Sequence, residues 1–286
     1  MIGRLAIVIL LICYRDTCGE DQLIPNSFRH SNAFAMLPQY KLLFCRIHKA
    51  GSAALTALAS SISPPPYPDL PTWTHHQPTD YNLSAADVSR VLRDPSWLKV
   101  VIYRDPLARF LSAYRSKCEE FDRDRVCSSV FHERRPSFAG AIRQMILRED
   151  FSPDGHFHPQ AEICDLQTTL PYFTDRFALD RTSSYTTITR ILDQAHVKIT
   201  ERVNKTIYRH FAPPGMEHSS HHITHSEETS TLLSYYNHDC FIRLIVHHYQ
   251  IDYFLFQLPC PDWAMEALER TTLDECMKFI ETHRFD

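Results

Sequence analysis

Apolar residues gather along the chain in two nearly continuous runs, each followed by a segment of helical character. Residues 40–46 and 98–103 are dominated by large apolar side chains, as in strands buried on both faces of a parallel sheet. Small residues and leucines follow the first run over residues 52–62, as in a helix that packs closely on a sheet. This alternation predicts an α/β fold of three layers with a central parallel sheet, and the last third of the chain is predicted to be helical.

The turn after the first apolar run has the composition of an anion-binding corner. The first N–H groups of a helix lack intrahelical acceptors and lie at the positive end of its dipole, so they bind anions such as phosphate. Here the helix follows a short stretch of small residues, and a lysine adds a full positive charge. The predicted anion-binding residues are Lys49, Ala50, Gly51, Ser52 and Ala53.

A second helix start follows the other apolar run. Arg104 ends that run, Asp105 occupies the N-cap position and Pro106 lies in the first helical turn. Ser112 lies eight residues beyond Arg104, two turns into the predicted helix. Arg109 lies between them, and two interpretations of it stay open: it contacts the same ligand as Arg104, or it forms an ordinary surface ion pair.

These two corners resemble those of the sulfotransferases, and most closely of the Golgi carbohydrate sulfotransferases of the chondroitin and HNK-1 type, in a divergent form like those abundant in nematodes. The resemblance spans roughly residues 40 to 257. Its segments are Lys49–Ser52, Arg104–Tyr114, Gly155–Gln160 with Cys164, and Asp252–Phe256. The family has Pro at the position of His48, and the stretch after Cys164 matches only loosely.

The resemblance implies a fold, a donor and roles for the site residues. In that family, a Lys-containing loop after the first strand holds the 5′-phosphosulfate of PAPS (3′-phosphoadenosine 5′-phosphosulfate). An Arg and a Ser eight residues later hold its 3′-phosphate. Lys49, Gly51 and Ser52 match the first element, and Arg104 with Ser112 match the second. The implied fold is the three-layer, P-loop-like sulfotransferase fold, similar to the core of the nucleotide kinases.

Transfer to a hydroxyl requires a group that accepts its proton. His156 is the predicted base, because it lies in the segment that resembles the family's His-aromatic-x-Pro-Gln motif. The alternative is that His156 and His158 only hydrogen-bond loop backbone. His48 is a competing base, although the family's Pro at that position argues against a general requirement. Lys49 is the second predicted catalytic residue, because its charge stabilises the leaving phosphate.

The predicted function is PAPS-dependent, in-line transfer of a sulfuryl group to a hydroxyl of a glycan, either chondroitin-like or another carbohydrate. PAPS is the predicted co-substrate, a glycan or proteoglycan is the predicted acceptor, and no metal is required. The alternative is a lumenal or secreted glycan-binding protein that keeps the fold and has lost transfer. A P-loop kinase or GTPase is disfavoured, because the chain lacks the Gly-x-x-x-x-Gly-Lys-Ser/Thr pattern.

The length and net charge of the chain further restrict the class of protein to which it can belong. The chain has 286 residues, of which 44% are hydrophobic, enough to bury a full core. Its formal net charge of −4 lacks the basic excess of nucleic-acid-binding domains, so no nucleic-acid partner is predicted. We expect one catalytic domain over residues 39–286, preceded by a polar, irregular stem or N-terminal arm over residues 20–38.

The N-terminus predicts targeting to the secretory pathway. One Arg precedes an apolar run of about nine residues, which is shorter than the ~20 residues needed to span a bilayer. Residues 1–19 are predicted to be a signal peptide, or a short signal anchor if they are retained. The expected location is the Golgi lumen, as a type II membrane protein, or the outside of the cell. Glycosylation sequons at Asn82 and Asn204 are compatible with that compartment.

Nine cysteines favour the same compartment. Apart from the one in the N-terminal apolar run, they form an even set that an oxidising lumen can pair. Cys118 with Cys127 is the most local pairing, whereas Cys45, inside a predicted core strand, is expected to be a buried free thiol. His221 and His225 have the i, i+4 spacing of a metal site. No His-Glu-x-x-His arrangement accompanies them, so a polar loop is favoured over a zinc site.

Overall fold

The computed structural model describes residues 31–64, 75–119, 125–151, 153–180, 183–213, 229–283 and 285. The predicted signal segment, most of the predicted stem and the His221/His225 pair lie outside these residues. Within the described part of the chain, no helix is both long enough and apolar enough to cross a membrane.

A four-stranded sheet with the order β1-β2-β3-β4 lies at the centre of the fold. The strands are β1 (Phe34–Leu37), β2 (Leu42–Cys45), β3 (Leu98–Tyr103) and β4 (Asp175–Ala178). Strands β2, β3 and β4 are parallel, as predicted, and β1 adds an antiparallel edge to β2. The prediction of an irregular arm is wrong for β1, because all four of its side chains are buried in the sheet.

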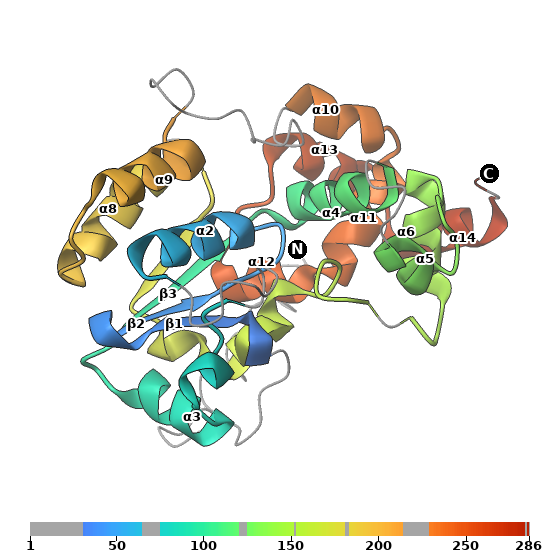
Figure 1. Ribbon diagram of the computed structural model, residues 1–286. Helices are drawn as coiled ribbons and strands as arrows, with labels where there is room; N and C mark the ends of the chain where they lie inside the picture. Colours follow the sequence, from blue (N-terminus) through green and yellow to red (C-terminus); the bar gives the residue numbers. More distant parts are fainter. Residues whose placement is uncertain are drawn as a thin grey trace.

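Helices cover both faces of the sheet (Figure 1). One layer contains α2 (Ser52–Ile62), α8 (Ser184–Gln194) and α9 (Glu201–Phe211); the other contains α3 (Ala85–Arg93), α7 (Leu166–Thr169) and α12 (Gln250–Phe256). Leu42 and Phe44 pack into the first layer and Leu43 and Cys45 into the second, because alternate side chains of a strand point to opposite faces. The three-layer α/β prediction is therefore confirmed.

A separate helical lobe with its own hydrophobic core lies beside the sheet, on the right in Figure 1. Its helices are α4 (Pro106–Tyr114), α5 (Arg125–Phe131), α6 (Phe138–Leu147), α10 (Thr229–Tyr235), α11 (Asp239–His248), α13 (Asp262–Arg270) and α14 (Leu273–Thr282). Phe110, Phe138 and Tyr249 pack together in this core. The predicted helical last third of the chain forms most of this lobe.

Short helical turns connect the longer elements. They are the 3₁₀ turns η1 (Ser31–Ala33), η2 (Pro38–Tyr40), η4 (Pro78–Tyr81), η6 (Gln160–Asp165) and η7 (Leu170–Tyr172), and the π-helical turn η5 (Arg115–Glu119). Five of the longer helices begin where a side chain satisfies a free backbone N–H group. The N-cap residues Ser84, Asp105, Ser137, Thr200 and Thr272 each accept the N–H of the residue three positions on.

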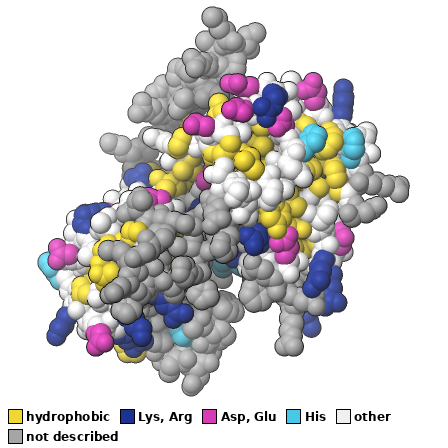
Figure 2. Space-filling model, turned by 90° about the horizontal axis from the view of Figure 1, so that it is seen from above, with side chains coloured by type: hydrophobic (Ala, Val, Ile, Leu, Met, Phe, Trp, Pro, Cys, Tyr) yellow, Lys and Arg dark blue, Asp and Glu magenta, His cyan; other side chains and the backbone are white. Residues whose placement is uncertain are grey.

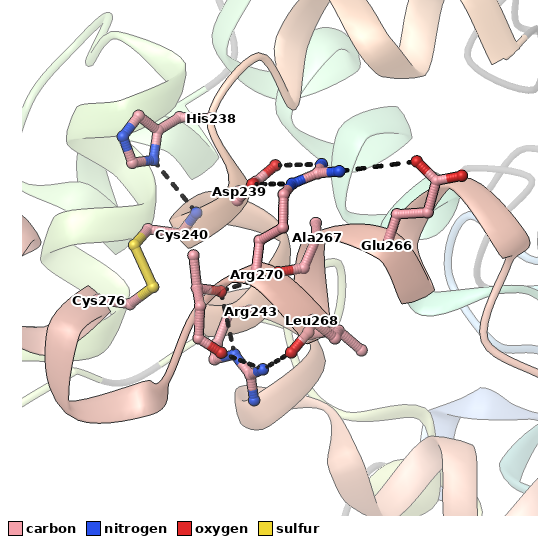
Figure 3. A network of polar contacts seen from close by, with 10 residues as sticks. His238, Asp239, Cys240, Arg243, Glu266, Ala267, Leu268, Arg270 and Cys276 are labelled. Atoms are coloured by element: carbon pink, nitrogen blue, oxygen red, sulfur yellow. Dashed lines mark hydrogen bonds and ion pairs between the residues drawn. A yellow bond between two sulfur atoms is a disulfide. The ribbon is translucent and has the colours of Figure 1, made fainter.

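The last helices are joined covalently and by polar contacts (Figure 3). A disulfide between Cys240 and Cys276 links α11 to α14. Arg270 of α13 donates to both carboxylate oxygens of Asp239, at 2.7 and 3.0 Å. Arg243 of α11 donates to backbone carbonyls at the C-terminal end of α13. These contacts hold together α11, α13 and α14, and α4 packs against α11 within the same lobe.

Candidate functional site

The loop between β2 and α2 places Lys49 and Gly51 at a helix start. Gly51 is the N-cap of α2 with φ of 85°, a left-handed conformation that suits glycine, and no side chain caps this helix. The amides of Ser52 and Ala53 in the first turn consequently have no acceptor within the helix. Lys49 is left-handed as well, with φ of 63°, a conformation that costs about 1–2 kcal/mol for a residue with a Cβ. This backbone is arranged to bind an anion.

Ala50 differs from the other residues of this corner. Its surface is 1% exposed, and its amide already donates to the carbonyl of Ile47 at 3.1 Å. Ala53, by contrast, is exposed at the start of α2. Ala50 is therefore a packing residue of the turn, and the amides left for a ligand are those of the first helical turn.

The second corner meets the first one. The guanidinium of Arg104 donates from Nη1 to the carbonyl oxygen of Lys49 at 3.2 Å. Asp105 caps α4 by accepting the N–H of Ala108 at 3.0 Å, and Tyr253 donates its hydroxyl to the other oxygen of Asp105 at 3.0 Å. The convergence of the two corners, inferred from their strand–helix pattern, is thus present.

Arg104 and Ser112 are nearly covered. They are 4% and 3% exposed, respectively, and Ser112 lies two turns into α4 from the Arg104 end. A ligand at this corner can therefore contact them only at their exposed edges. Both lie on the same strand–helix unit, so the α4 backbone fixes their spacing.

Arg109 joins two loops and does not present its charge to solvent. Its surface is 1% exposed. Its Nε donates to the carbonyl of His48 at 2.9 Å, Nη1 to that of His158 at 2.7 Å, and Nη2 to that of Gly155 at 3.2 Å. Neither interpretation from the sequence, ligand contact or surface ion pair, matches this placement. Arg109 is a positioning residue that fixes the first corner against the 155–158 loop.

A carboxylate holds His156. Oδ2 of Asp154 lies 2.9 Å from Nδ1 of His156, and Oδ1 accepts the backbone N–H of His156 at 2.9 Å. Burial raises the pKa of Asp154, but the hydrogen bonds and charge of His156 outweigh burial and lower that pKa overall. An ionised acceptor at Nδ1 keeps the ring proton there and leaves Nε2 as the ring's acceptor. The side chain of His156 is 17% exposed, so a ligand can reach it.

His48 packs against His156, with ring centroids 4.3 Å apart and the ring planes tilted by 38°. Burial, followed by the nearby His156 and Arg109, lowers the pKa of His48 to about 3. Because so weak a base is poorly suited to accept a hydroxyl proton, the arrangement favours His156 over His48 as the base. Gly155 provides the space for this pair: a Cβ on Gly155 would lie 2.8 Å from Cδ2 of His48.

Asp252 hydrogen-bonds the backbone of the segment that follows His156. It is fully buried, and its two oxygens accept the N–H groups of Gln160 at 2.9 Å and Ala161 at 2.8 Å. Gln160 in turn binds the backbone of Arg104 through Oε1 at 3.0 Å and Nε2 at 2.8 Å. Burial raises the pKa of Asp252, and the charge of Arg109 opposes that effect. Asp252 thus connects the closing motif to both corners.

A disulfide between Cys45 and Cys164 ties β2 to the same loop. The expectation of a free thiol at Cys45 is wrong, although Cys45 is fully buried as predicted. The chain after Gln160 passes beside β2 and brings Cys164 against the strand. The other pairing, Cys118 with Cys127, is confirmed.

Three residues of this site had no role assigned from the sequence: Asp154, Gln160 and Asp252. Gln160 and Asp252 lie in segments that carry the family resemblance. A single carboxylate within an otherwise apolar closing motif was the available signal for Asp252. Asp154 stands two residues before His156, and only the folded loop shows that its side chain turns back onto the ring.

The sulfotransferase family model matches residues 32–259. The chain therefore belongs to the sulfotransferase family. Among curated proteins it is similar to "Uncharacterized protein C18B2.2" of Caenorhabditis elegans, with 23% identity over 184 residues, which cover 54% of this chain and 49% of the relative. The chain thus spans about half the length of that relative. No solved structure matches the chain.

Membership of the sulfotransferase family supports sulfuryl transfer, in general terms, as the chemistry to be considered for this site. It also implies PAPS as the sulfate donor. The residues present fit such a molecule, because the uncapped start of α2 offers backbone amides just after Lys49, whose backbone carbonyl contacts the Arg104 guanidinium.

Proposed function

We propose that this sulfotransferase transfers a sulfuryl group from PAPS to a hydroxyl of a glycan in the secretory pathway. The observation that carries the proposal is the contact between the Arg104 guanidinium and the Lys49 carbonyl at 3.2 Å. Buried Arg109 ties this corner to the loop of His156. One region thus combines two cations with an oriented base, which is what transfer from a phosphorylated donor to a hydroxyl requires.

Each residue has a distinct role in this proposal. PAPS supplies the sulfuryl group and a phosphate that can leave. Lys49 and the first amides of α2 stabilise negative charge on that phosphate, and Arg104 with Ser112 binds the distant 3′-phosphate. His156 accepts the proton of the acceptor hydroxyl at Nε2, while Asp154 keeps Nδ1 protonated.

Two observations support a secretory location. The described residues contain three disulfides, and disulfides persist in oxidising compartments. Asn82 and Asn204 are both exposed, so both sequons are accessible to N-glycosylation. The proposal includes residues 1–19 as the targeting segment, either cleaved or retained as a membrane anchor.

The test is transfer of labelled sulfate from PAPS by the full chain secreted from a eukaryotic host. Chondroitin, dermatan, heparan and N-glycan acceptors are compared with PAP binding measured alongside. We expect label on at least one acceptor, and loss of label in His156→Ala with PAP binding retained.

The outcomes separate the parts of the proposal. No PAP binding would contradict the donor assignment. PAP binding with no labelled glycan would contradict the acceptor assignment. Glycan binding without turnover in the wild type would favour the alternative, a glycan-binding protein that has lost transfer.

A further inference from the structure

A stripe of positive charge lies on α9, away from the His156 loop. Residues 196–210 contain four Lys or Arg and one Glu, whereas the whole chain carries a net charge of −4. Three of these cations, Arg202, Lys205 and Arg209, are exposed on α9. At 3.6 residues per turn they fall within about 60° of one another around the helix. We call these three residues the α9 basic stripe.

The opposite side of α9 is buried. Val203, Ile207 and Phe211 pack into the core that α9 shares with α2 and α8. The helix is therefore fixed in rotation, and its charged side faces outward. Figure 2 shows dark blue cationic side chains on the left-hand part of the molecule, where α8 and α9 lie in Figure 1.

A cavity of about 420 Å³ borders the stripe. Its walls are formed by Ala57 of α2 and by residues of α9, namely the three cations of the stripe together with Glu201, Thr206 and His210. Cavities that bind ligands commonly have ~300–1,000 Å³. The stripe therefore borders a cavity that is open to solvent and whose volume falls in this range.

The stripe lies against α2, the helix that begins at the Lys49 corner. Arg202 donates from Nη2 to the carbonyl of Ser60, near the C-terminal end of α2, at 2.9 Å. Helix α9 packs against α2, and Arg209 lines the same cavity as Ala57 of α2. From Arg202 to Arg209 the stripe is about 10 Å long at 1.5 Å per residue.

We propose that the α9 basic stripe and its cavity bind an anionic glycan chain, namely the part of the acceptor that extends beyond the modified sugar. The inference rests on the proposed glycan acceptor. A chain with several carboxylates or sulfates is repelled by a protein of net charge −4 unless cations are concentrated where it binds. Three cations on one side of a helix provide that concentration, and binding releases counterions from the polyanion.

The experiment measures binding of a fluorescent chondroitin sulfate oligosaccharide to the full chain as salt is varied. The double variant Lys205→Ala/Arg209→Ala removes two charges of the stripe, and alanine preserves the helix. The matched control is Arg134→Ala/Arg135→Ala, which removes two exposed arginines between α5 and α6. We expect the stripe variant to bind about 10- to 30-fold more weakly, with the slope of log K against log salt reduced by about 1–2. The control should bind like the wild type.

Three outcomes would overturn the inference. The two double variants could lose affinity equally, or the stripe variant could bind like the wild type. Alternatively, a single-stranded oligonucleotide of equal charge could bind more tightly than the glycan. Circular dichroism checks the fold of each variant, and Lys205→Gln replaces the double variant if that one unfolds.

PAP binding, measured on the same proteins, separates this inference from the proposed function. PAP binding without stripe-dependent glycan binding would refute the inference and leave the donor assignment intact. Stripe-dependent glycan binding without PAP binding would support the inference and contradict the donor assignment. Binding of uncharged dextran at the same strength would contradict an electrostatic site.

Discussion

Asp154→Asn removes the charge that orients His156 while it keeps the shape of the side chain. In the wild type, Oδ2 of Asp154 lies 2.9 Å from Nδ1 of His156. A hydrogen bond to a charged partner contributes about 1.5–3 kcal/mol and a neutral one about 0.5–1.5 kcal/mol, so the variant loses about 1–1.5 kcal/mol. Asp154 is 32% exposed, and solvent weakens the charge effect, which favours the lower value. The expected fall in kcat is therefore about 5- to 10-fold.

The assay is the initial rate of sulfate transfer at saturating PAPS and acceptor. A second histidine of the same loop provides a matched control, because Nδ1 of His158 lies 3.0 Å from Oε2 of Glu162, a carboxylate that is also 32% exposed. Glu162→Gln therefore makes the same chemical change beside a histidine with no proposed role. We expect it to keep wild-type kcat, and both variants to keep the wild-type affinity for PAP and the wild-type unfolding midpoint.

Wild-type kcat in Asp154→Asn would show that the carboxylate does not orient the base. Equal loss in Asp154→Asn and Glu162→Gln would show a general effect of loop charge. A loss of PAP affinity in Asp154→Asn alone would place Asp154 in donor binding.

Three further predictions concern the same region and the buried histidines. Lys49→Ala should lower kcat on the order of 100-fold or more with a smaller effect on PAP affinity, because the charge acts on the leaving phosphate; equal small effects in the kinetic assay would reject that role. Gly155→Ala should destabilise the fold by about 1–3 kcal/mol in urea unfolding, because its Cβ would lie 2.8 Å from His48; an unchanged midpoint would contradict the packing of that ring. Burial lowers the pKa of His48 to about 3 and those of His76 and His248 to about 4. These histidines are neutral in the folded protein, whereas in the unfolded chain they bind a proton below about pH 6.5. The stability that they contribute is therefore complete above pH 6.5 and is lost as the pH falls toward the folded-state values. Between pH 6.5 and 5, each of these histidines should lower the free energy of unfolding by up to about 2 kcal/mol. A thermal unfolding midpoint that does not shift over this range would contradict the lowered pKa values.

The sequence predicts most of the scaffold because its signals are local. β3 occupies residues 98–103 and α2 residues 52–62, as the apolar run and the small-residue helix indicate. The start of α4 follows from Asp105 and Pro106, whose preferences act within one turn. The meeting of the two corners follows from topology, since adjacent parallel strands bring their C-terminal ends to one edge.

The remaining features depend on which loops meet in space. The sequence does not show that Arg109 is a buried positioning residue, because its three carbonyl acceptors lie in two loops that are distant in the sequence. The link between Cys45 and Cys164 spans 119 residues, and an even number of cysteines does not give their connectivity. β1 was missed because an edge strand of four residues carries too few positions to show a pattern.

The long-range disulfide between Cys45 and Cys164 also determines when the protein can complete its folding. Synthesis must proceed past position 164 before β2 can be joined to the loop of His156. Closing a loop of this length is worth about 4–5 kcal/mol in the chain-entropy treatment. A cell that keeps its thiols reduced would therefore yield protein whose strand and loop are held together only by noncovalent packing and polar contacts. Recombinant enzyme for assays should come from a host that oxidises its secreted cargo.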